Sequence, residues 1–316
     1  MKRGANILVE TCASVKAGER VAIVTDDERL PIAHAIEEAV EGVGGNAVVI
    51  VTPARKIDNE EPSSEIAEKM KEADVVFLPL TLAMAHTRAT HEAISEGARV
   101  LSLSAFTKRQ MQEGGLFTDF HARKPVCDAL AEKLTHASHV RVTNPAGTNL
   151  TFSIEGRSGN SHCCLLDQPG FTAVPNIEAN ISPVEGTAEG VLVVDGSIPY
   201  YGVGVIEDPV VFNLEKGFVT DIQGGGQAAF IRDLLETQND RFVYNVAQFA
   251  IGLNQACVDF TGEMLNDEGV NGTIHMGIGS SANLGGTVRA KTHFDAIIRS
   301  PSVLLDGESI QRFLSA

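Results

Sequence analysis

Hydrophobic residues in the first 140 positions alternate between short β-branched runs and longer amphipathic stretches. The β-branched runs predict strands over 20–25, 46–52, 73–80 and 98–103. The stretches between them predict helices over 30–43, 60–72 and 87–96. Strands and helices that alternate at this spacing predict a parallel sheet with helices on both faces. Neither a GxGxxG nor a Walker A loop follows these strands, so the pattern lacks a loop that would hold nucleotide phosphates.

From about His139 onward the pattern changes to short strands bounded by Gly, Pro and Asn. Strands are predicted over 140–143, 149–154, 190–195, 209–212 and 217–222, with one helix over 226–237. Strands of this length and spacing are typical of a mixed or antiparallel sheet. We therefore predict an α/β fold with two domains, a Rossmann-like domain over 1–138 and an α+β domain over 139–316.

Composition limits the classes of function. The chain has 316 residues, of which 43% are hydrophobic, and a formal charge of −16 that argues against a nucleic-acid partner. It contains no apolar run of about 18 residues, so no membrane span is expected. The N-terminus lacks the apolar core of a signal peptide, and five cysteines without a CxxC pattern suit reduced thiols in a cytoplasm. Adjacent strand residues point to opposite faces, so we favour a structural role for His162-Cys163-Cys164.

The most informative residues lie near the C-terminus. His293 and Asp295 are two positions apart, so on a strand both side chains leave the same face of a sheet. His275 lies 18 residues earlier (293 − 275), a separation that a glycine-rich hairpin closes. Two imidazoles and a carboxylate are a ligand set for zinc or non-haem iron. On spacing alone, a buried structural histidine or a half-exposed salt bridge remains an alternative.

Several motifs follow one another in an order that resembles a known family. They are Asn149–Arg157, Pro183–Gly190, Ala250–Asn254, Gly272–His275 and Thr292–Asp295. Together they resemble the aminopeptidase T (thermophilic metalloprotease) family and its relative, 2,5-dihydroxypyridine 5,6-dioxygenase. The resemblance covers most of 140–310 and is weaker in the first half of the chain.

The resemblance implies a metal centre and the residues that form it. In the aminopeptidases, two metal ions are bound by two glutamates, two histidines, a tyrosine and an aspartate. Four of these ligands fall on Glu178, His275, His293 and Asp295. The second glutamate is replaced by Gln248 and the tyrosine by Ala282, so we expect one ion rather than two, because a neutral amide offsets the repulsion between two dications poorly. In the dioxygenase, the position of Gln248 is a histidine that binds iron, whereas those of Glu178 and His275 are not ligands.

Other residues are candidates for roles around the metal. Glu185, or Glu178 itself, would move a proton in hydrolysis. Glu268 is a candidate for orienting His275, with a solvated turn as the alternative. Arg157 is a candidate for binding a substrate carboxylate, with a structural salt bridge as the alternative. His86 follows the third predicted strand and resembles the histidine that acts as a base in the dioxygenase.

These observations lead to a metalloenzyme with a small-molecule substrate. We predict a hydrolase of the aminopeptidase T type that acts on a peptide or amide with one Zn²⁺, Co²⁺ or Mn²⁺ ion per chain. The alternatives are a mononuclear Fe²⁺ dioxygenase that cleaves the ring of a hydroxylated pyridine, and a non-catalytic binding protein on the same framework. The resemblance also implies a homodimer or a larger homo-oligomer.

Overall fold

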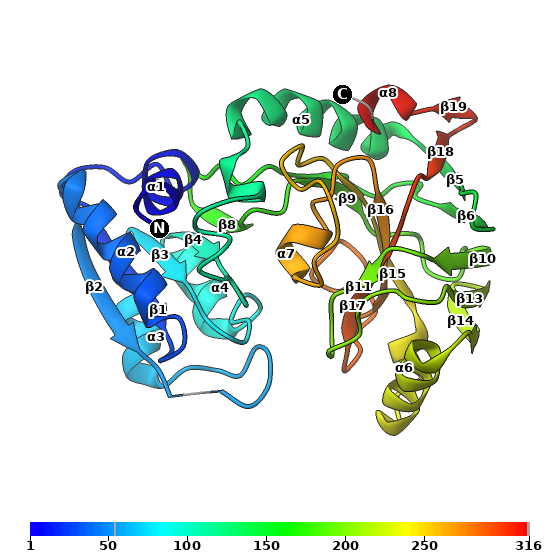
Figure 1. Cartoon of the computed structure of the whole chain (residues 1–316), viewed down its shortest axis with the longest axis horizontal. Helices are drawn as coiled ribbons and strands as arrows, with labels where there is room; N and C mark the ends of the chain where they lie inside the picture. Colours follow the sequence, from blue (N-terminus) through cyan, green and yellow to red (C-terminus); the bar gives the residue numbers. More distant parts are fainter. Residues whose placement is uncertain (54, 315–316) are drawn as a thin grey trace. The chain divides into compact units, whose positions relative to one another are not determined.

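The chain forms two units in a computed structural model that describes residues 1–53 and 55–314 (Figure 1). The first unit consists of Met1–His121 and Cys163–Pro175, and the second of Ala122–His162 and Asn176–Ala316. The predicted domains divide the chain once, at residue 138. The contacts divide it near residue 121 and assign a later segment to the first unit.

The first unit is built on a five-stranded parallel sheet in the order β2-β1-β3-β4-β8. Its strands are β1 (Arg20–Thr25), β2 (Asn46–Val51), β3 (Val75–Leu78), β4 (Arg99–Ser102) and β8 (Gly170–Ala173). Its helices are α1 (Lys2–Asn6), η1 (Ile7–Cys12), α2 (Leu30–Gly42), α3 (Ser64–Lys71), α4 (Arg88–Ser95) and η2 (Gly115–Phe117). Crossovers between parallel strands are nearly always right-handed, and for this strand order that rule puts α2 on one face and α3 with α4 on the other. In agreement, α3 contacts α4.

Local sequence fixes where these helices begin. Ser63 caps α3 by accepting a hydrogen bond from the backbone N–H of Ile66, and Thr87 caps α4 by accepting from that of Thr90. The predicted helix over 60–72 therefore begins later, at Ser64, because the capping residue is Ser63. Below the helices, the strands contribute buried aliphatic side chains to the core of this unit.

The second unit contains two seven-stranded sheets. Sheet B has the order β14-β13-β10-β6-β5-β18-β19, from β5 (His139–Thr143), β6 (Asn149–Ser153), β10 (Glu189–Val194), β13 (Val210–Glu215), β14 (Phe218–Gln223), β18 (Ser302–Leu305) and β19 (Glu308–Ser309). Sheet C has the order β12-β11-β17-β16-β15-β9-β7, from β7 (Asn160–His162), β9 (Glu178–Ile181), β11 (Ser197–Ile198), β12 (Gly204–Val205), β15 (Val246–Gly252), β16 (Ile274–Gly279) and β17 (His293–Ile298). The helices are α5 (Phe120–His136), α6 (Gly226–Thr237), η3 (Arg241–Tyr244), α7 (Met264–Asp267) and α8 (Gln311–Leu314).

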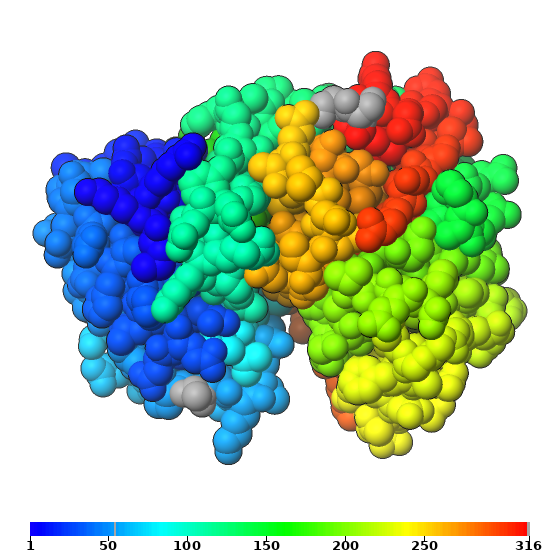
Figure 2. All heavy atoms as spheres, viewed as in Figure 1, coloured from blue at the N-terminus to red at the C-terminus, as the bar shows by residue number. Residues whose placement is uncertain are grey.

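The two sheets pack against each other through aromatic side chains. Phe249 on β15 contacts Phe152 of sheet B with ring centroids 5.2 Å apart, and Phe294 on β17 lies 6.4 Å from Phe212. Because strand residues alternate between faces, the chain neighbours of Phe249 and of Phe294 point to the other face of sheet C. Helix α6 lies at the surface (Figure 2), and its Phe230 side chain is half-exposed.

The predicted fold class is confirmed: a parallel α/β sheet in one part of the chain and antiparallel sheets in the other. The predicted helix over 226–237 matches α6, and the predicted strands of the second half match β5, β6, β10, β13 and β14 within a few residues. Helix α5 was not predicted, because its hydrophobic face is weakly marked and it contains Pro125. Among the residues that the structure describes, no helix is both long and apolar enough to cross a bilayer.

Candidate metal centre

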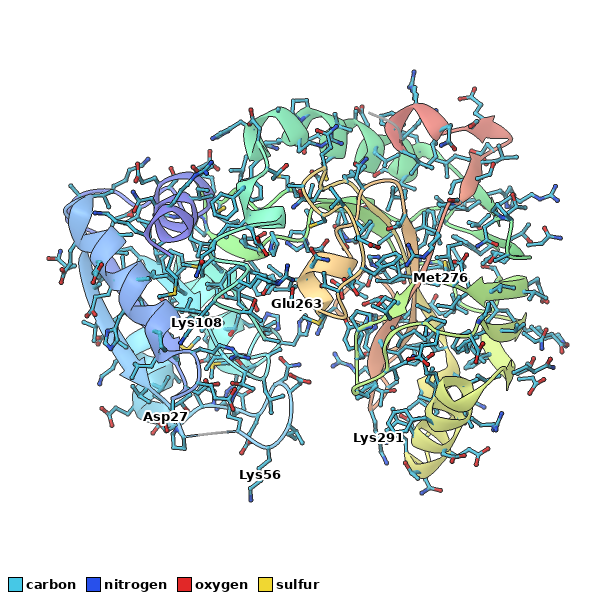
Figure 3. All side chains as sticks on the ribbon, in the orientation of Figure 1. Asp27, Lys56, Lys108, Glu263, Met276 and Lys291 are labelled. Carbon is cyan, nitrogen blue, oxygen red and sulfur yellow. The ribbon has the colours of Figure 1, made fainter. Side chains whose placement is uncertain are left out.

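Four neighbouring strands of sheet C present polar side chains on a single face. On β16, Ile274, Met276 and Ile278 alternate with His275, Gly277 and Gly279. Figure 3 marks this strand by Met276, which lies between His275 and Gly277 in the chain and therefore points to the opposite face. The apolar set packs toward sheet B, so the histidine and the glycines face the other way.

Strand register brings the predicted ligands together on this second face. Gly277 lies between Gln248 on β15 and Asp295 on β17, and Gly279 lies opposite His293. His275 lies opposite Ala250, which in turn pairs with Asn180 on β9, two residues from Glu178. Directly paired residues share a face, so the glycine-rich strand is the floor of a cluster of polar side chains.

Gly277 leaves the space around which these side chains are arranged. A Cβ atom at this position would lie 2.7 Å from the Gln248 Cβ atom, 2.8 Å from His293 Cε1 and 3.0 Å from Asp295 Oδ1. These separations are too short for real carbon atoms, so any side chain here would displace the candidate ligands. The absence of a side chain at Gly277 is therefore a requirement of the site.

Three nitrogen and oxygen atoms face one another above this floor. His293 Nε2 lies 3.5 Å from Asp295 Oδ1, and His275 Nε2 lies 3.9 Å from the same oxygen. His275 and Asp295 are only 1% and 3% exposed. Within the described residues, both ring nitrogens of His275 and Asp295 Oδ1 are buried without a hydrogen-bond partner. Buried polar atoms are normally satisfied, so these atoms indicate a group that the chain itself does not supply.

Two of these candidate ligands are held through their other polar atom. The Nδ1 atom of His293 lies 2.8 Å from the carbonyl oxygen of Ser280, which accepts a hydrogen bond when Nδ1 carries the hydrogen. The Tyr200 hydroxyl lies 2.8 Å from Asp295 Oδ2. The first contact leaves His293 Nε2 directed at the cluster, and the second leaves Asp295 Oδ1 directed at it, as metal-binding side chains require.

Charge and burial act in opposite directions on these two residues. Burial disfavours the imidazolium of His293, but the Asp295 carboxylate outweighs it, so the pKa of His293 is raised. Burial also disfavours the Asp295 carboxylate, but His293 and His275 outweigh this effect and the pKa of Asp295 is lowered. The two shifts favour the pair of a His293 imidazolium and an Asp295 carboxylate.

Glu178 enters the cluster surrounded by side-chain amides. Its Oε1 atom accepts hydrogen bonds from Asn180 (2.6 Å) and Gln248 (3.2 Å), and its Oε2 atom accepts one from Asn176 (2.9 Å). The same Oε2 atom lies 3.4 Å from His275 Nε2. The amides satisfy a buried carboxylate without a counter-cation and direct Oε2 toward His275.

A second buried carboxylate, Glu268, lies behind Asp295. Its Oε1 atom is 2.7 Å from the Tyr200 hydroxyl, and its Oε2 atom accepts a hydrogen bond of 3.0 Å from Asn176. Burial, together with the nearby Asp295 and Glu178 carboxylates, raises the pKa of Glu268 well above its ordinary value. Burial and the same kind of anionic neighbour, Asp295 and Glu268, raise the pKa of Tyr200. The alternative of a solvated turn at Glu268 is wrong, because this side chain is buried.

The donor set fits a divalent metal. Ligand atoms around one ion with bonds of about 2.0–2.2 Å lie roughly 3.0–3.5 Å apart. The distances from His293 to Asp295 and from His275 to Glu178 fall at the upper end of this range, and that from His275 to Asp295 exceeds it. As the side chains stand in the part of the chain that the structure describes, no group of three or more His, Cys, Asp or Glu is closed around a metal position. Small movements of the two imidazoles would be needed to close it.

Other predicted site residues have different surroundings. Glu185 pairs with Arg157 and accepts hydrogen bonds from the backbone N–H and hydroxyl of Thr287. Arg157 also donates to the carbonyl oxygen of Gly285. These contacts fasten the loop between β16 and β17, and they support the structural alternative for Arg157. His86 belongs to the first unit, where its ring lies 6.4 Å from that of Phe171. Catalytic roles for Glu185 and His86 stay predictions.

Sequence reasoning missed several residues that complete the cluster. Tyr200, Asn176 and Asn180 contact the candidate ligands but lie in no motif. His162, for which a structural role is predicted from sequence, lies opposite Glu178 in the ladder between β7 and β9, and burial lowers its pKa. For Asn180, the alternation Glu178-Ala179-Asn180 on a strand was an available signal, because it places both polar side chains on one face. Tyr200 offered none, since it follows a strand of two residues.

The fold and this arrangement define a candidate metal centre on an antiparallel sheet, and comparison with known proteins supplies the family. Residues 8–312 match the family 2,5-dihydroxypyridine 5,6-dioxygenase (NicX). The 2,5-dihydroxypyridine 5,6-dioxygenase of Pseudomonas putida is 24% identical over 241 residues, which span 73% of this chain and 67% of that protein. The chain therefore belongs to the 2,5-dihydroxypyridine 5,6-dioxygenase family, a family of enzymes.

Two solved structures share the fold. The structure of 2,5-dihydroxypyridine dioxygenase from Pseudomonas putida KT2440 superimposes with a TM-score of 0.81 at 20% identity, covering 98% of this chain and 94% of that one. AmpT from Thermus thermophilus superimposes with a TM-score of 0.68 at 14% identity and covers 98% of both chains. At these identities the structures show the fold alone.

The family overturns the predicted activity. The prediction of a hydrolase of the aminopeptidase T type is wrong, because the family match extends over nearly the whole chain and names the dioxygenase. The resemblance to the aminopeptidases reflects a shared fold, as the superposition on AmpT shows. The alternative of a dioxygenase, which ranked second on sequence, agrees with the family.

Proposed function

We propose that this protein is a mononuclear Fe²⁺ dioxygenase that cleaves the ring of a hydroxylated nitrogen heterocycle, of which 2,5-dihydroxypyridine is the first candidate. Membership of the family supports the reaction class, and a dioxygenase of this kind suggests a divalent metal such as Fe²⁺. The observation that carries the proposal is the convergence of His275 Nε2 and His293 Nε2 on Asp295 Oδ1. Two histidines and one carboxylate on one face are the protein ligands of many non-haem iron oxygenases.

In this proposal His275, His293 and Asp295 hold the metal, and Glu178 is the fourth candidate ligand. The resemblance to the dioxygenase gives one ligand place to the position of Gln248, which here is an amide that donates to Glu178. Gln248 pairs with Gly277, and His275 lies two residues before Gly277 on the same face of the sheet. His275 therefore supplies the second imidazole in place of the residue that is missing at position 248.

A bound Fe²⁺ ion would supply the oxygen and one-electron chemistry that amino-acid side chains lack. The chain's own residues bind and orient. Ser280 fixes the tautomer of His293, and the amides around Glu178 hold this carboxylate in place. Burial of His275 and Asp295 excludes water from one side of the cluster, whereas the side chain of His293 is 26% exposed. A substrate would therefore approach from the side of His293.

His86 is a separate part of the proposal, as a base that removes a proton from a ring hydroxyl. Its place after β3, at the carboxyl end of a parallel strand, supports this role, because α/β sheets bind ligands at that edge. His86→Asn would test the role separately, through a loss of turnover with unchanged iron content.

Anaerobic loading with Fe²⁺ tests the proposed function. We expect about one iron per chain, and oxygen uptake with loss of the ring absorbance when 2,5-dihydroxypyridine is added. A panel of hydroxylated pyridines would then define the substrate. The matched control is His293→Ala, which should bind no iron and consume no oxygen while remaining folded. Stoichiometric iron without oxygen uptake on any member of the panel would contradict the proposal and favour the non-catalytic alternative.

A further inference from the structure

We propose that Tyr200 is a positioning residue that presents Asp295 to the metal through a single oxygen atom. The inference rests on the proposed function, because it takes Asp295 as a ligand. It concerns a residue that lies outside the sequence motifs and outside the ligand set. Tyr200 thereby decides how many coordination positions the protein occupies and how many remain for substrate and oxygen.

The contacts of Asp295 divide its two oxygen atoms. Oδ2 lies 2.8 Å from the Tyr200 hydroxyl, within hydrogen-bond distance. Oδ1 faces His293 and His275 and has no hydrogen-bond partner among the residues that the structure describes. A carboxylate held in this way offers one oxygen to a cation, whereas a free carboxylate is able to bind through both.

Tyr200 is itself held from two sides. Its hydroxyl lies 2.7 Å from Glu268 Oε1, and Glu268 is fixed by Asn176 through its other oxygen. The backbone N–H of Tyr200 donates to the carbonyl oxygen of Ile198 at the end of β11, and β11 pairs with β17, the strand of Asp295. The phenol ring is thus anchored to the same sheet as the ligand that it contacts, and this anchoring limits rotation of the Asp295 carboxylate.

The surroundings favour a supporting role for Tyr200 over a role as a metal ligand. Its oxygen atom lies between two carboxylate oxygens, at 2.7 and 2.8 Å. Both close contacts of the hydroxyl are with carboxyl oxygens of the chain, so the hydroxyl is engaged by side chains that surround the ligand cluster. The hydroxyl has one hydrogen and two acceptor lone pairs, so it is able to donate to Asp295 Oδ2 while its lone pairs face Glu268 Oε1.

The composition of the chain makes this inference directly measurable. The sequence has no tryptophan and three tyrosines, so the near-ultraviolet difference spectrum that accompanies metal binding reports on tyrosine. Metal-free full-length protein is titrated with Mn²⁺ and, separately, Co²⁺, by calorimetry and by difference absorption. The proteins compared are the wild type, Tyr200→Phe, and the matched control Tyr244→Phe, whose hydroxyl lies on η3 beside Glu236.

In the wild type and in Tyr244→Phe, we expect metal binding to perturb the spectrum of a protonated tyrosine. Tyr200→Phe should lack that signal, bind metal about 10- to 100-fold more weakly, and change the visible spectrum of bound Co²⁺, because the second Asp295 oxygen becomes free. If Tyr200→Phe does not fold, a double variant with Tyr201→Phe and Tyr244→Phe leaves Tyr200 as the one tyrosine, and metal must then perturb it.

The outcomes separate this inference from the proposed function. Wild-type metal affinity and an unchanged Co²⁺ spectrum in Tyr200→Phe would overturn the positioning role and leave the iron site standing. A phenolate difference spectrum would overturn it as well, since Tyr200 would then be a ligand. A wild-type protein that binds neither metal would contradict the proposed function and this inference together.

Discussion

Gly277 and Asp295 lie opposite each other on β16 and β17, and a Cβ atom added to the glycine would lie 3.0 Å from Asp295 Oδ1. Across its other edge the same glycine faces Gln248. The strand that carries His275 therefore contributes an imidazole at one position and empty space at the next one on that face. Both contributions are needed, because a ligand set without room for a cation binds nothing.

Gly277→Ala should therefore remove metal binding while the protein stays folded. The methyl group would collide with Gln248 and with His293, so we expect at least a tenfold loss of metal affinity and a stability loss of about 1–3 kcal/mol from overpacking. Calorimetry with Mn²⁺ and urea unfolding measure the two effects. Gly226→Ala is the control, since open space surrounds this position at the start of α6 and metal affinity should not change. Wild-type affinity in Gly277→Ala would mean that the cation does not bind above this glycine.

Metal affinity should rise with pH through the titration of His293. The pKa of His293 is raised above 6.5 because the Asp295 carboxylate outweighs burial, so a proton occupies the ring in the metal-free protein over a wider pH range. A metal ligand must be neutral, so proton and metal compete. The stability of the metal-free protein changes with pH in the opposite direction. The contribution of protonated His293 to the free energy of unfolding is complete below pH 6.5 and is lost as pH rises through the raised pKa. The test is to measure the apparent dissociation constant for Mn²⁺ from about pH 5.5 to 8.5, a range that brackets the ordinary pKa of histidine. A flat profile would contradict it.

The fold could be predicted because each periodicity has a direct physical cause. The run at Arg20–Thr25 is a buried strand of the parallel sheet, the run at Asn46–Val51 is its partly exposed edge strand, and the stretch between them, α2, follows the helical period. Which strands pair with each other could not be predicted from these periodicities. β8 adds to the edge of the first sheet beside β4, although more than sixty residues separate the two strands, and local pattern contains no information on such a pairing.

The candidate site, like the fold, could be predicted from the sequence only in part. Strand alternation alone places His293 and Asp295 on one face, and the ladder confirms that they share it with His275. The side chains that hold them come from elsewhere: Tyr200 follows β11, and Glu268 follows α7. Their contacts depend on tertiary packing, which neither spacing nor composition specifies. The ligand set alone could not identify the activity, because two imidazoles and carboxylates suit hydrolysis and oxygen chemistry alike. The choice between them came from the family match.

Gln248→Glu should destabilise the metal-free protein and make its stability depend on metal. Gln248 donates to Glu178 Oε1 at 3.2 Å, and a carboxylate at this position would replace that donor by a second buried anion. Loss of the hydrogen bond and the new repulsion should cost about 1–3 kcal/mol. Divalent metal should restore stability, and the metal content should rise above one per chain. Thermal unfolding with and without Mn²⁺, and elemental analysis, measure both. Equal stability with and without metal would show that position 248 does not face the site.

Asp267→Ala should unfold the protein more easily without acting on the metal directly. The Asp267 carboxylate is fully buried and accepts hydrogen bonds from the side chains and backbone of the segment around it: Thr261, Gly262, Ser197 and Asn266. Removal leaves several buried donors unsatisfied, so we expect a loss of about 3 kcal/mol or more in the free energy of unfolding. Asp259→Ala, whose side chain is exposed, should change it by less than about 0.5 kcal/mol. Urea denaturation of both variants decides, and similar midpoints would contradict the anchoring role of Asp267.

Glu185→Gln separates the catalytic role predicted from sequence from the structural role that its contacts support. Glu185 accepts from the Thr287 backbone N–H at 2.7 Å and pairs with Arg157, and these partners outweigh burial and lower its pKa. The resulting stabilisation is present above the ordinary pKa and is lost as pH falls through the lowered one. If Glu185 fastens the loop over 281–292, the glutamine variant should show faster hydrogen exchange in that loop, with metal affinity and oxygen uptake within about threefold of wild type, since only one charged contact is weakened. If Glu185 moves a proton in the reaction, turnover should fall about 10²- to 10⁴-fold while exchange in the loop stays unchanged. Hydrogen-exchange mass spectrometry and oxygen uptake on the same preparation decide between the two roles, and the contacts of Arg157 and Thr287 lead us to expect the first.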